Sequence, residues 1–136
     1  MYARISILLV VFLLMLFSSC QEKKADFFER DAREYTAKNC PQKFDDYTRL
    51  DSIVFVKGGE MGDLKLYFSI TMLDDITRAE VKKHLSELGK QNLKVVRNSV
   101  LFAKHKEAGV SFTYIYTDEE RGDKIAEYHF TKQDYK

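Results

Sequence analysis

Hydrophobic and polar residues alternate over residues 64–72, and this is the clearest strand signal in the chain. The hydrophobic positions are Leu64, Leu66, Phe68, Ile70 and Met72, with Lys65, Tyr67, Ser69 and Thr71 between them. Successive side chains of a strand point to opposite faces of a sheet. The pattern therefore predicts a strand with one buried face and one solvated face.

Three other segments carry strand signals. Residues 49–57 contain the β-branched and aromatic run 53–56, which Gly58-Gly59 ends, so we expect them to pair with residues 64–72 as a hairpin. Alternation returns over residues 110–117, and residues 124–131 follow a charged turn. These two segments predict a second hairpin.

Helical patterns occupy the remaining segments. Residues 26–38 lack Gly and Pro and carry a helical stripe of aromatic and alanine side chains. Thr77 and Glu80 have the spacing of a capping box, which predicts a helix that begins at Thr77 and ends before Gly89. Residues 93–107 fit either a helix or a strand, and the flanking lysines and the stop signal at Ala108-Gly109 favour a helix.

The order of helix, hairpin, helices and hairpin predicts an α+β fold. We expect a single two-layer domain over residues 26–136, with a four-stranded, mainly antiparallel sheet and two or three helices on one face. No repeat, low-complexity segment or Pro-rich linker divides these residues.

The first residues have the features of an export signal. Arg4 precedes an apolar run at residues 5–17, and the small residues Ser18-Ser19 come directly before Cys20. The run has 13 residues, whereas a bilayer core of ~30 Å needs about 20. The pattern favours a cleaved signal, and an uncleaved anchor helix is the alternative.

This segment resembles the bacterial lipoprotein signal, in which a large apolar residue and two small residues precede a cysteine. The resemblance implies that residues 1–19 are removed, that the Cys20 thiol receives a diacylglycerol, and that residues 20–25 form a lipidated tether. The expected location is the bacterial cell envelope, with a lipid anchor in the outer membrane. Gln21 favours the outer membrane because some inner-membrane lipoproteins carry aspartate at that position.

Charge and cysteine content limit the classes of partner. The chain has 22 basic and 21 acidic residues, and loss of Arg4 with the signal leaves 21 of each. No net positive field is therefore expected to attract nucleic acid or anionic lipid. Lipidation of Cys20 would leave Cys40 as the remaining thiol, so no internal disulfide is expected.

Sequence motifs for catalysis are weak. Cys40 with His84, His105 or His129 could form a thiolate pair, but their spacing does not support one. No zinc or calcium motif, phosphate-binding loop or nucleophile elbow occurs, so we predict no catalytic residue, metal or cofactor. A thiol-dependent hydrolase, or another enzyme that uses Cys40, is kept as an alternative.

One motif joins the first helix to the first strand. Residues 40–51 have the pattern C-P-x-x-x-D-x-x-T-x-L-D and resemble a signature of small, uncharacterised bacterial envelope proteins. Its side chains Cys40, Asp45, Thr48 and Asp51 form either a structural joint, in which they cap backbone amides, or the lining of a binding groove.

The polar face of the predicted sheet is a candidate binding surface. Its candidate contact residues are Tyr67, Thr113, Glu127 and His129, which suit hydrogen bonding to a protein or glycan. An ordinary solvated sheet face is the alternative. The function predicted from the sequence is a membrane-anchored binding or accessory module for another envelope component. A structural subunit of an envelope complex is a further alternative.

Overall fold

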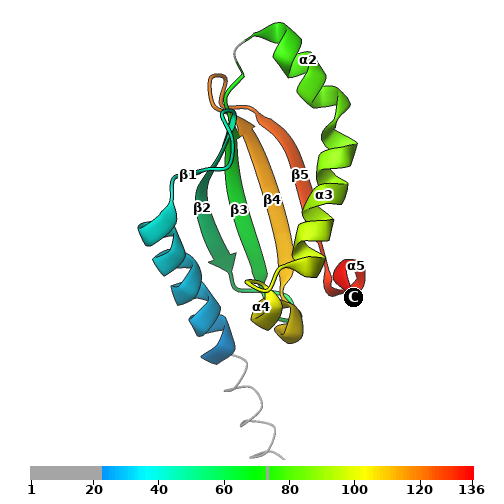
Figure 1. The fold of residues 1–136 in the computed structure, drawn as a ribbon. Coiled ribbons are helices and arrows are strands. Elements are labelled where there is room, and N and C mark those ends of the chain that lie inside the picture. Colours follow the sequence, from blue (N-terminus) through cyan, green and yellow to red (C-terminus); the bar gives the residue numbers. More distant parts are fainter. Residues whose placement is uncertain (1–22, 73) are drawn as a thin grey trace, which may run out of the picture.

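The computed structural model describes residues 23–72 and 74–136, so the predicted signal and Cys20 lie outside the described residues (Figure 1). The elements are an N-terminal helix at residues 23–39, β1 (Gln42–Lys43), β2 (Thr48–Val56), β3 (Asp63–Ile70), α2 (Asp75–Lys83), α3 (Leu85–Asn98), α4 (Ala103–Ala108), β4 (Ser111–Asp118), β5 (Lys124–Phe130) and α5 (Lys132–Tyr135). Within this described part, no helix combines the length and the apolarity needed to cross a bilayer.

The five strands form one sheet in the order β1-β2-β3-β4-β5. The α+β class is confirmed, and the sheet is mainly antiparallel, since three of its four strand pairings are antiparallel. The structure differs from the expected four-stranded sheet in two details. The two-residue β1 is too short to give a periodic signal, and it adds a fifth strand. In addition, β3 and β4 pair in parallel, because α2, α3 and α4 carry the chain back along the sheet before β4 begins.

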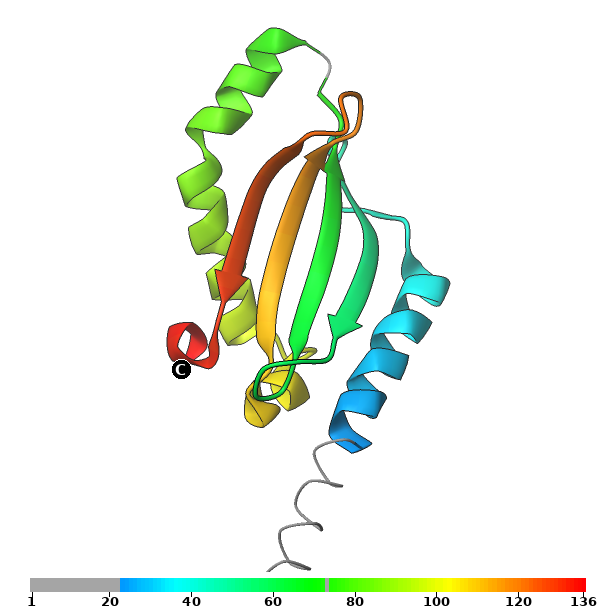
Figure 2. The same cartoon turned by 180° about the vertical axis from the view of Figure 1, so that it is seen from behind.

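The helices lie on one side of the sheet, and its other side is open to solvent (Figures 1 and 2). Alternation in β3 is confirmed, since its even-numbered residues are buried and its odd-numbered residues are partly exposed. The core extends across all the larger strands and includes Leu50, Phe55, Leu64, Leu66, Phe112, Tyr114 and Phe130. The fold is therefore a two-layer domain with a single hydrophobic core.

The N-terminal helix packs against the β2 side of the sheet. It buries Phe28 and Ala32, and Phe28 lies 5.6 Å from the ring of Phe55. Thr36 Oγ1 accepts the backbone N–H of Ile53 and donates to the carbonyl of Ile53, both at 2.9 Å. These contacts satisfy backbone groups at the outer edge of β2 and so protect part of that edge from pairing with another strand.

The predicted helix from Thr77 to Gly89 is wrong at both ends. Asp74 is the N-cap of α2, and its side chain accepts the N–H of Thr77 at 2.7 Å. Gly89 lies inside α3, where a Cβ atom would come 2.7 Å from the ring of Tyr128. The glycine therefore allows α3 to approach β5 closely and does not end a helix.

The ambiguous segment 93–107 is helical, as expected, but residues 99–102 divide it between α3 and α4. Gly109 ends α4 with φ of 82°, and its N–H bonds the carbonyls of His105 and Lys106. The predicted stop at Ala108-Gly109 is therefore confirmed, because glycine adopts the left-handed conformation without steric cost.

His105 is a buried titratable group in α4. Its ring stacks on Phe28 at 4.4 Å, and Nδ1 has no hydrogen-bond partner among the described residues. Burial lowers the pKa of His105, against a smaller opposing effect of Asp31. The folded protein thus favours the neutral imidazole, and protonation must weaken the contact between the N-terminal helix and α4.

The substitution His105→Phe is expected to reduce the acid sensitivity of the fold. The wild-type free energy of unfolding should be highest above about pH 6.5, the unfolded pKa of histidine, and should fall as the pH decreases toward the lower folded pKa. Urea unfolding at about pH 7.5 and about pH 5 measures this loss. His84→Gln is the control, because His84 is exposed at the α2–α3 junction and should leave the loss unchanged. An equal loss in His105→Phe and His84→Gln would contradict the prediction.

Candidate functional site

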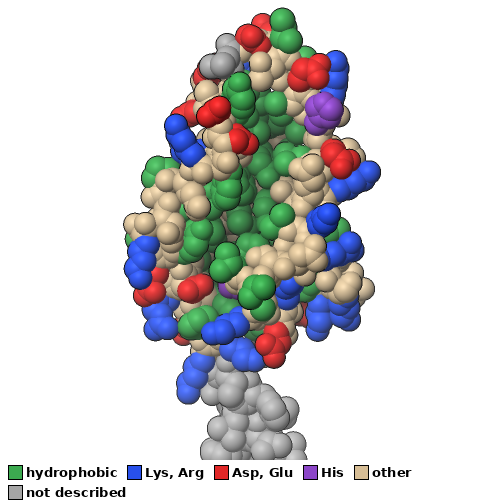
Figure 3. Space-filling model, in the orientation of Figure 1, with side chains coloured by type: hydrophobic (Ala, Val, Ile, Leu, Met, Phe, Trp, Pro, Cys, Tyr) green, Lys and Arg blue, Asp and Glu red, His purple; other side chains and the backbone are tan. Residues whose placement is uncertain are grey.

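A band of hydrophobic surface runs between the N-terminal helix and α3 (Figure 3). The two helices flank the middle of the sheet, and β3 and β4 pass between them with no helix in front (Figure 1). We call this feature the trough: its walls are the N-terminal helix and α3, and its floor is formed by Leu66, Phe68, Tyr114 and Tyr116. Each floor residue is at most 7% exposed, so the band is narrow.

Stacked aromatic rings form the floor of the trough. Phe68 stacks on Tyr116 with centroids 4.8 Å apart, and it lies parallel to Tyr114 at 5.8 Å. Phe44, which precedes β2, contacts Phe68 at 5.9 Å and remains 58% exposed. The floor is therefore rigid and apolar, and it is bordered by an aromatic side chain that is free to make further contacts.

The α3 wall presents a stripe at helical spacing. Asn92 Nδ2 donates to the hydroxyl of Tyr116 at 2.9 Å, which fixes this side of α3 above β4. Leu88 and Val95 lie four residues before and three residues after Asn92, so they share its side of the helix. Val95 is 52% exposed and Leu88 is partly buried. This wall therefore offers apolar surface next to the floor.

Tyr114 adds one polar group to the floor. The residue is 3% exposed, and its hydroxyl makes no hydrogen bond within the described part of the chain. The hydroxyl oxygen nevertheless keeps some contact with solvent. Burial raises the pKa of Tyr114 above its usual range, and burial also raises the pKa of Tyr116 to about 12. Tyr114 therefore stays protonated and can donate to or accept from a bound group.

The apolar floor and walls of the trough match the apolar face of an amphipathic helix in chemical character. The sequence predicted these floor residues as core but gave no signal for the trough. The spacing between two helices depends on tertiary contacts such as Asn92 with Tyr116 and Thr36 with Ile53.

The structure places all four candidate residues of the predicted polar face on the open side of the sheet. Tyr67 lies beside Ile115, which lies beside Glu127, and Thr113 pairs with His129. Thr113 is only 3% exposed, however, and its hydroxyl lies 2.8 Å from Nδ1 of His129. Thr113 is therefore poorly placed to touch a partner, whereas Tyr67, Glu127 and His129 remain accessible.

Hydrogen bonds within the open face occupy several of its polar groups. Thr113 Oγ1 donates to Asp63 Oδ2 at 2.7 Å, and Ser111 Oγ donates to Asp63 Oδ1 at 3.0 Å. Lys124 Nζ donates to Glu127 at 2.9 Å and is the main cause of the lowered pKa of Glu127. The face has fewer unengaged groups than its composition suggests, which favours a solvated surface.

The motif at residues 40–51 makes internal hydrogen bonds. Asp45 Oδ1 accepts the N–H groups of Tyr47 at 2.7 Å and of Thr48 at 2.6 Å, and so closes the turn between β1 and β2. Asp51 lies at the bulge of β2 and accepts from Arg49 Nε at 2.6 Å. The Asp45 contacts support the structural-joint interpretation, whereas the Asp51 carboxylate accepts from the side chains of Arg49 and Ser69 and does not show the predicted capping of backbone amides among the described residues.

Cys40 is half-buried at the end of the N-terminal helix. Burial raises the pKa of its thiol, which disfavours the nucleophilic thiolate. Histidines lie on α4, on β5 and between α2 and α3, and no hydrogen bond joins any of them to Cys40 within residues 23–136. Among the described residues, no group of three or more His, Cys, Asp or Glu side chains could hold a metal ion.

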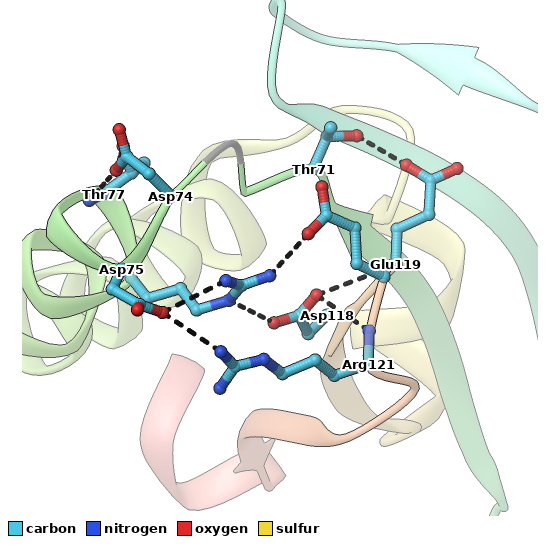
Figure 4. Close-up of polar contacts among 9 residues, drawn as sticks. Thr71, Asp74, Asp75, Thr77, Asp118, Glu119 and Arg121 are labelled. Atoms are coloured by element: carbon cyan, nitrogen blue, oxygen red, sulfur yellow. Dashed lines mark hydrogen bonds and ion pairs between the residues drawn. The ribbon is translucent and has the colours of Figure 1, made fainter.

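A charged cluster joins the start of α2 to the β4–β5 turn (Figure 4). Arg78 donates to Asp118 at 3.0 Å and to Glu120 at 2.6 Å, and the side chains of Arg78 and Asp118 are 13% and 5% exposed. The hydrogen bond from Arg78 is the main cause of the lowered pKa of Asp118. Arg121 donates to Asp75 at 3.1 Å. Because these groups are engaged with one another, the cluster holds the start of α2 against the β4–β5 turn.

Comparisons with known proteins identify a family and two structural neighbours. A family model described as a domain of unknown function (DUF8479) matches residues 23–126. A Pseudomonas aeruginosa protein described as secreted is similar to this chain in structure, with a TM-score of 0.68, 13% identity and coverage of 85% of this chain and 96% of that chain. The Vibrio vulnificus pilotin EpsS, from a type 2 secretion system, gives a TM-score of 0.65, 13% identity and coverage of 87% of this chain and 97% of that chain.

No curated protein matches the sequence. At 13% identity, the two structural neighbours show a shared fold and no more. The family match, in contrast, extends from the start of the N-terminal helix into β5 and covers most of the described domain. The chain therefore belongs to the DUF8479 family of domains of unknown function.

Proposed function

We propose that this protein is an accessory module of the cell envelope that binds an amphipathic helix of another envelope protein in the trough. The observation that carries the proposal is the stacked aromatic floor of Phe68, Tyr114 and Tyr116, at the base of the hydrophobic band between two helical walls (Figure 3). A helix-in-groove contact buries apolar anchors at positions i, i+3 or i+4, and i+7. The hydroxyl of Tyr114, which has no hydrogen-bond partner among the described residues, would add one directional hydrogen bond.

The structural likeness to a pilotin of a type 2 secretion system supports a role as an accessory to another envelope protein. A lipid on Cys20 would hold the domain at the membrane, preferably the outer membrane. In this mechanism the lipid determines position and the trough determines specificity. The open sheet face and the motif at residues 40–51 are less suited, because much of their polarity is engaged internally.

Site-specific photo-crosslinking of the full chain in its source cells tests the proposal. A photoreactive amino acid is placed at Phe44 or Val95 to probe the trough, and at Tyr67 to probe the open sheet face. We expect the two trough probes to capture one envelope protein, through one segment with apolar residues at helical spacing. Capture of a partner by the Tyr67 probe alone would contradict the proposal that the trough is the binding site and would favour the open sheet face.

The captured segment is then made as a peptide, and its dissociation constant is measured for the wild-type protein and for Val95→Arg. We expect the dissociation constant to rise about tenfold or more, because a charge would be buried in an apolar contact. Ile76→Arg is the matched control, since Ile76 is an exposed aliphatic residue of α2, 76% exposed and away from the floor. Equal affinity of the two variants would contradict the assignment of α3 as a wall.

A further inference from the structure

One end of the domain combines the start of the N-terminal helix with the start of α4. Phe28 stacks on His105 at 4.4 Å, and Lys104 Nζ lies 5.4 Å from the ring centroid of Phe27. Both views of the ribbon place these two helix starts at the same end, where the described chain begins (Figures 1 and 2). We call this end the basal surface, and define it by Lys23, Lys24, Phe27, Arg30, Val100, Leu101 and Lys104.

Large apolar side chains project from the basal surface. Val100 and Leu101 are 86% and 79% exposed, in the connection between α3 and α4. The next residue, Phe102, packs against Phe112 at 5.0 Å and so fixes the connection to the core. Phe27 adds a third apolar side chain, 38% exposed. Two adjacent, nearly fully exposed aliphatic residues on an anchored turn indicate a surface that contacts another apolar phase.

Cations lie beside one of these apolar side chains, since Arg30 Cζ and Lys104 Nζ are 5.7 Å and 5.4 Å from the ring centroid of Phe27. Lys23, Lys24, Arg30 and Lys104 form no ion pair with another described residue. The nearby carboxylates of Asp26 and Glu29 are instead engaged by Lys57. Lys and Arg side chains gather at this end of the space-filling view (Figure 3). The surface is therefore locally basic although the mature chain is balanced in charge.

We infer that the basal surface lies on an anionic phospholipid bilayer, with Val100 and Leu101 in the interface and the four cations at the headgroups. A surface that combines exposed aliphatic side chains with Lys and Arg matches the composition of interfacial membrane contacts. The chain supplies the second argument for a bilayer: two residues separate Lys23 from Cys20, so the distance between these two Cα atoms is at most about 11 Å. This second argument rests on the proposed lipid anchor, whereas the composition of the surface does not.

The orientation follows from this contact. The trough begins beside the basal surface, because its N-terminal wall starts there, and the α2 end of the domain points away from the bilayer (Figure 1). A helix in the trough would therefore approach the membrane at one end. The domain would then hold a partner close to the bilayer at a fixed angle and would not swing freely on its tether.

The sequence contains no tryptophan, so a single introduced tryptophan reports depth in the bilayer. The full chain carrying Leu101→Trp is reconstituted in vesicles of phosphatidylethanolamine and phosphatidylglycerol that include brominated lipids. We expect bromolipid to remove about half of its emission, since interfacial side chains reach about 5–10 Å into the headgroup and acyl boundary. Ile76→Trp, in α2, is the matched control and should keep its emission.

A second arm tests the cations. The triple change Lys23→Gln, Lys24→Gln and Lys104→Gln, added to Leu101→Trp, should restore most of the lost emission, as should vesicles of phosphatidylcholine alone. Lys82→Gln with Lys83→Gln, both in α2, should have no effect. The inference is overturned if Leu101→Trp and Ile76→Trp are equally open to aqueous acrylamide and equally insensitive to bromolipid. Mass spectrometry of the same sample determines whether Cys20 is acylated, so a failed anchor and a failed surface are distinguished.

Discussion

Replacing Phe112 by alanine is expected to lower the free energy of unfolding by about 3–5 kcal/mol. Phe112 is fully buried in β4, and its ring lies 5.0 Å from Phe102 and 5.6 Å from Tyr135. The side chain thus joins the sheet to α5 and to the turn before α4. Its removal leaves a cavity between three elements that the surrounding backbone cannot close.

Urea unfolding followed by circular dichroism measures this loss, with a two-state transition as the condition for the comparison. Phe44→Ala is the control, since Phe44 is 58% exposed and its loss should cost under about 1 kcal/mol. If Phe112→Ala does not fold, Phe112→Leu should fold with a smaller loss of about 1–1.5 kcal/mol, because it conserves more of the volume. A loss of under about 1 kcal/mol for Phe112→Ala, equal to that of Phe44→Ala, would contradict the central position of Phe112 in the core.

The parts of the fold that the sequence predicted correctly are those set by local periodicity. Alternation over residues 64–72 identified β3 and its buried face, because the strand pleat repeats every two residues. Gly109 identified the end of α4, since its left-handed conformation is a local requirement. The order of helices and hairpins followed from such signals and was sufficient for the α+β class.

The errors arose where long-range contacts decide the structure. Gly89 was interpreted as a helix end, but its contact with Tyr128 belongs to the packing of α3 on β5. The parallel pairing of β3 with β4 depends on how far α2, α3 and α4 carry the chain, which periodicity does not reveal. Capping was assigned to Thr77, whereas Asp74 supplies the acceptor, since several adjacent residues could fill that role.

The candidate surfaces were predicted unevenly for the same reason. Tyr67, Glu127 and His129 follow the strand period, so their shared face could be predicted from the sequence. The trough could not, because its walls belong to two helices far apart in the chain. The basal surface was hidden by the balanced total charge, which does not reveal that the fold brings Lys104 to Phe27, three and four residues after Lys24 and Lys23 in the N-terminal helix.

Replacing Cys20 by alanine is expected to abolish metabolic palmitate labelling of the protein. The lipoprotein resemblance makes the Cys20 thiol the acylation site, and Cys40 is the other cysteine in the chain. Cys40→Ala is therefore a matched control that should keep its label. Continued labelling of Cys20→Ala, or loss of the label in Cys40→Ala, would refute the proposed anchor.

Carbonate extraction tests whether the lipid on Cys20 is what attaches the protein to the membrane. With residues 1–19 replaced by an ordinary cleavable secretory signal, Cys20→Ala should be released by carbonate extraction, whereas the wild-type chain should stay with the membranes. Two or three acyl chains, at about 0.8 kcal/mol per buried CH₂, keep a protein in the membrane during such extraction, whereas a few exposed side chains do not. Binding of the released protein through the basal surface should then be reversible and should weaken as salt is added, because it depends on Lys and Arg at the headgroups. Salt-resistant attachment of unlabelled Cys20→Ala would show that the domain holds the membrane by itself, and the lipid would no longer be needed to explain its position.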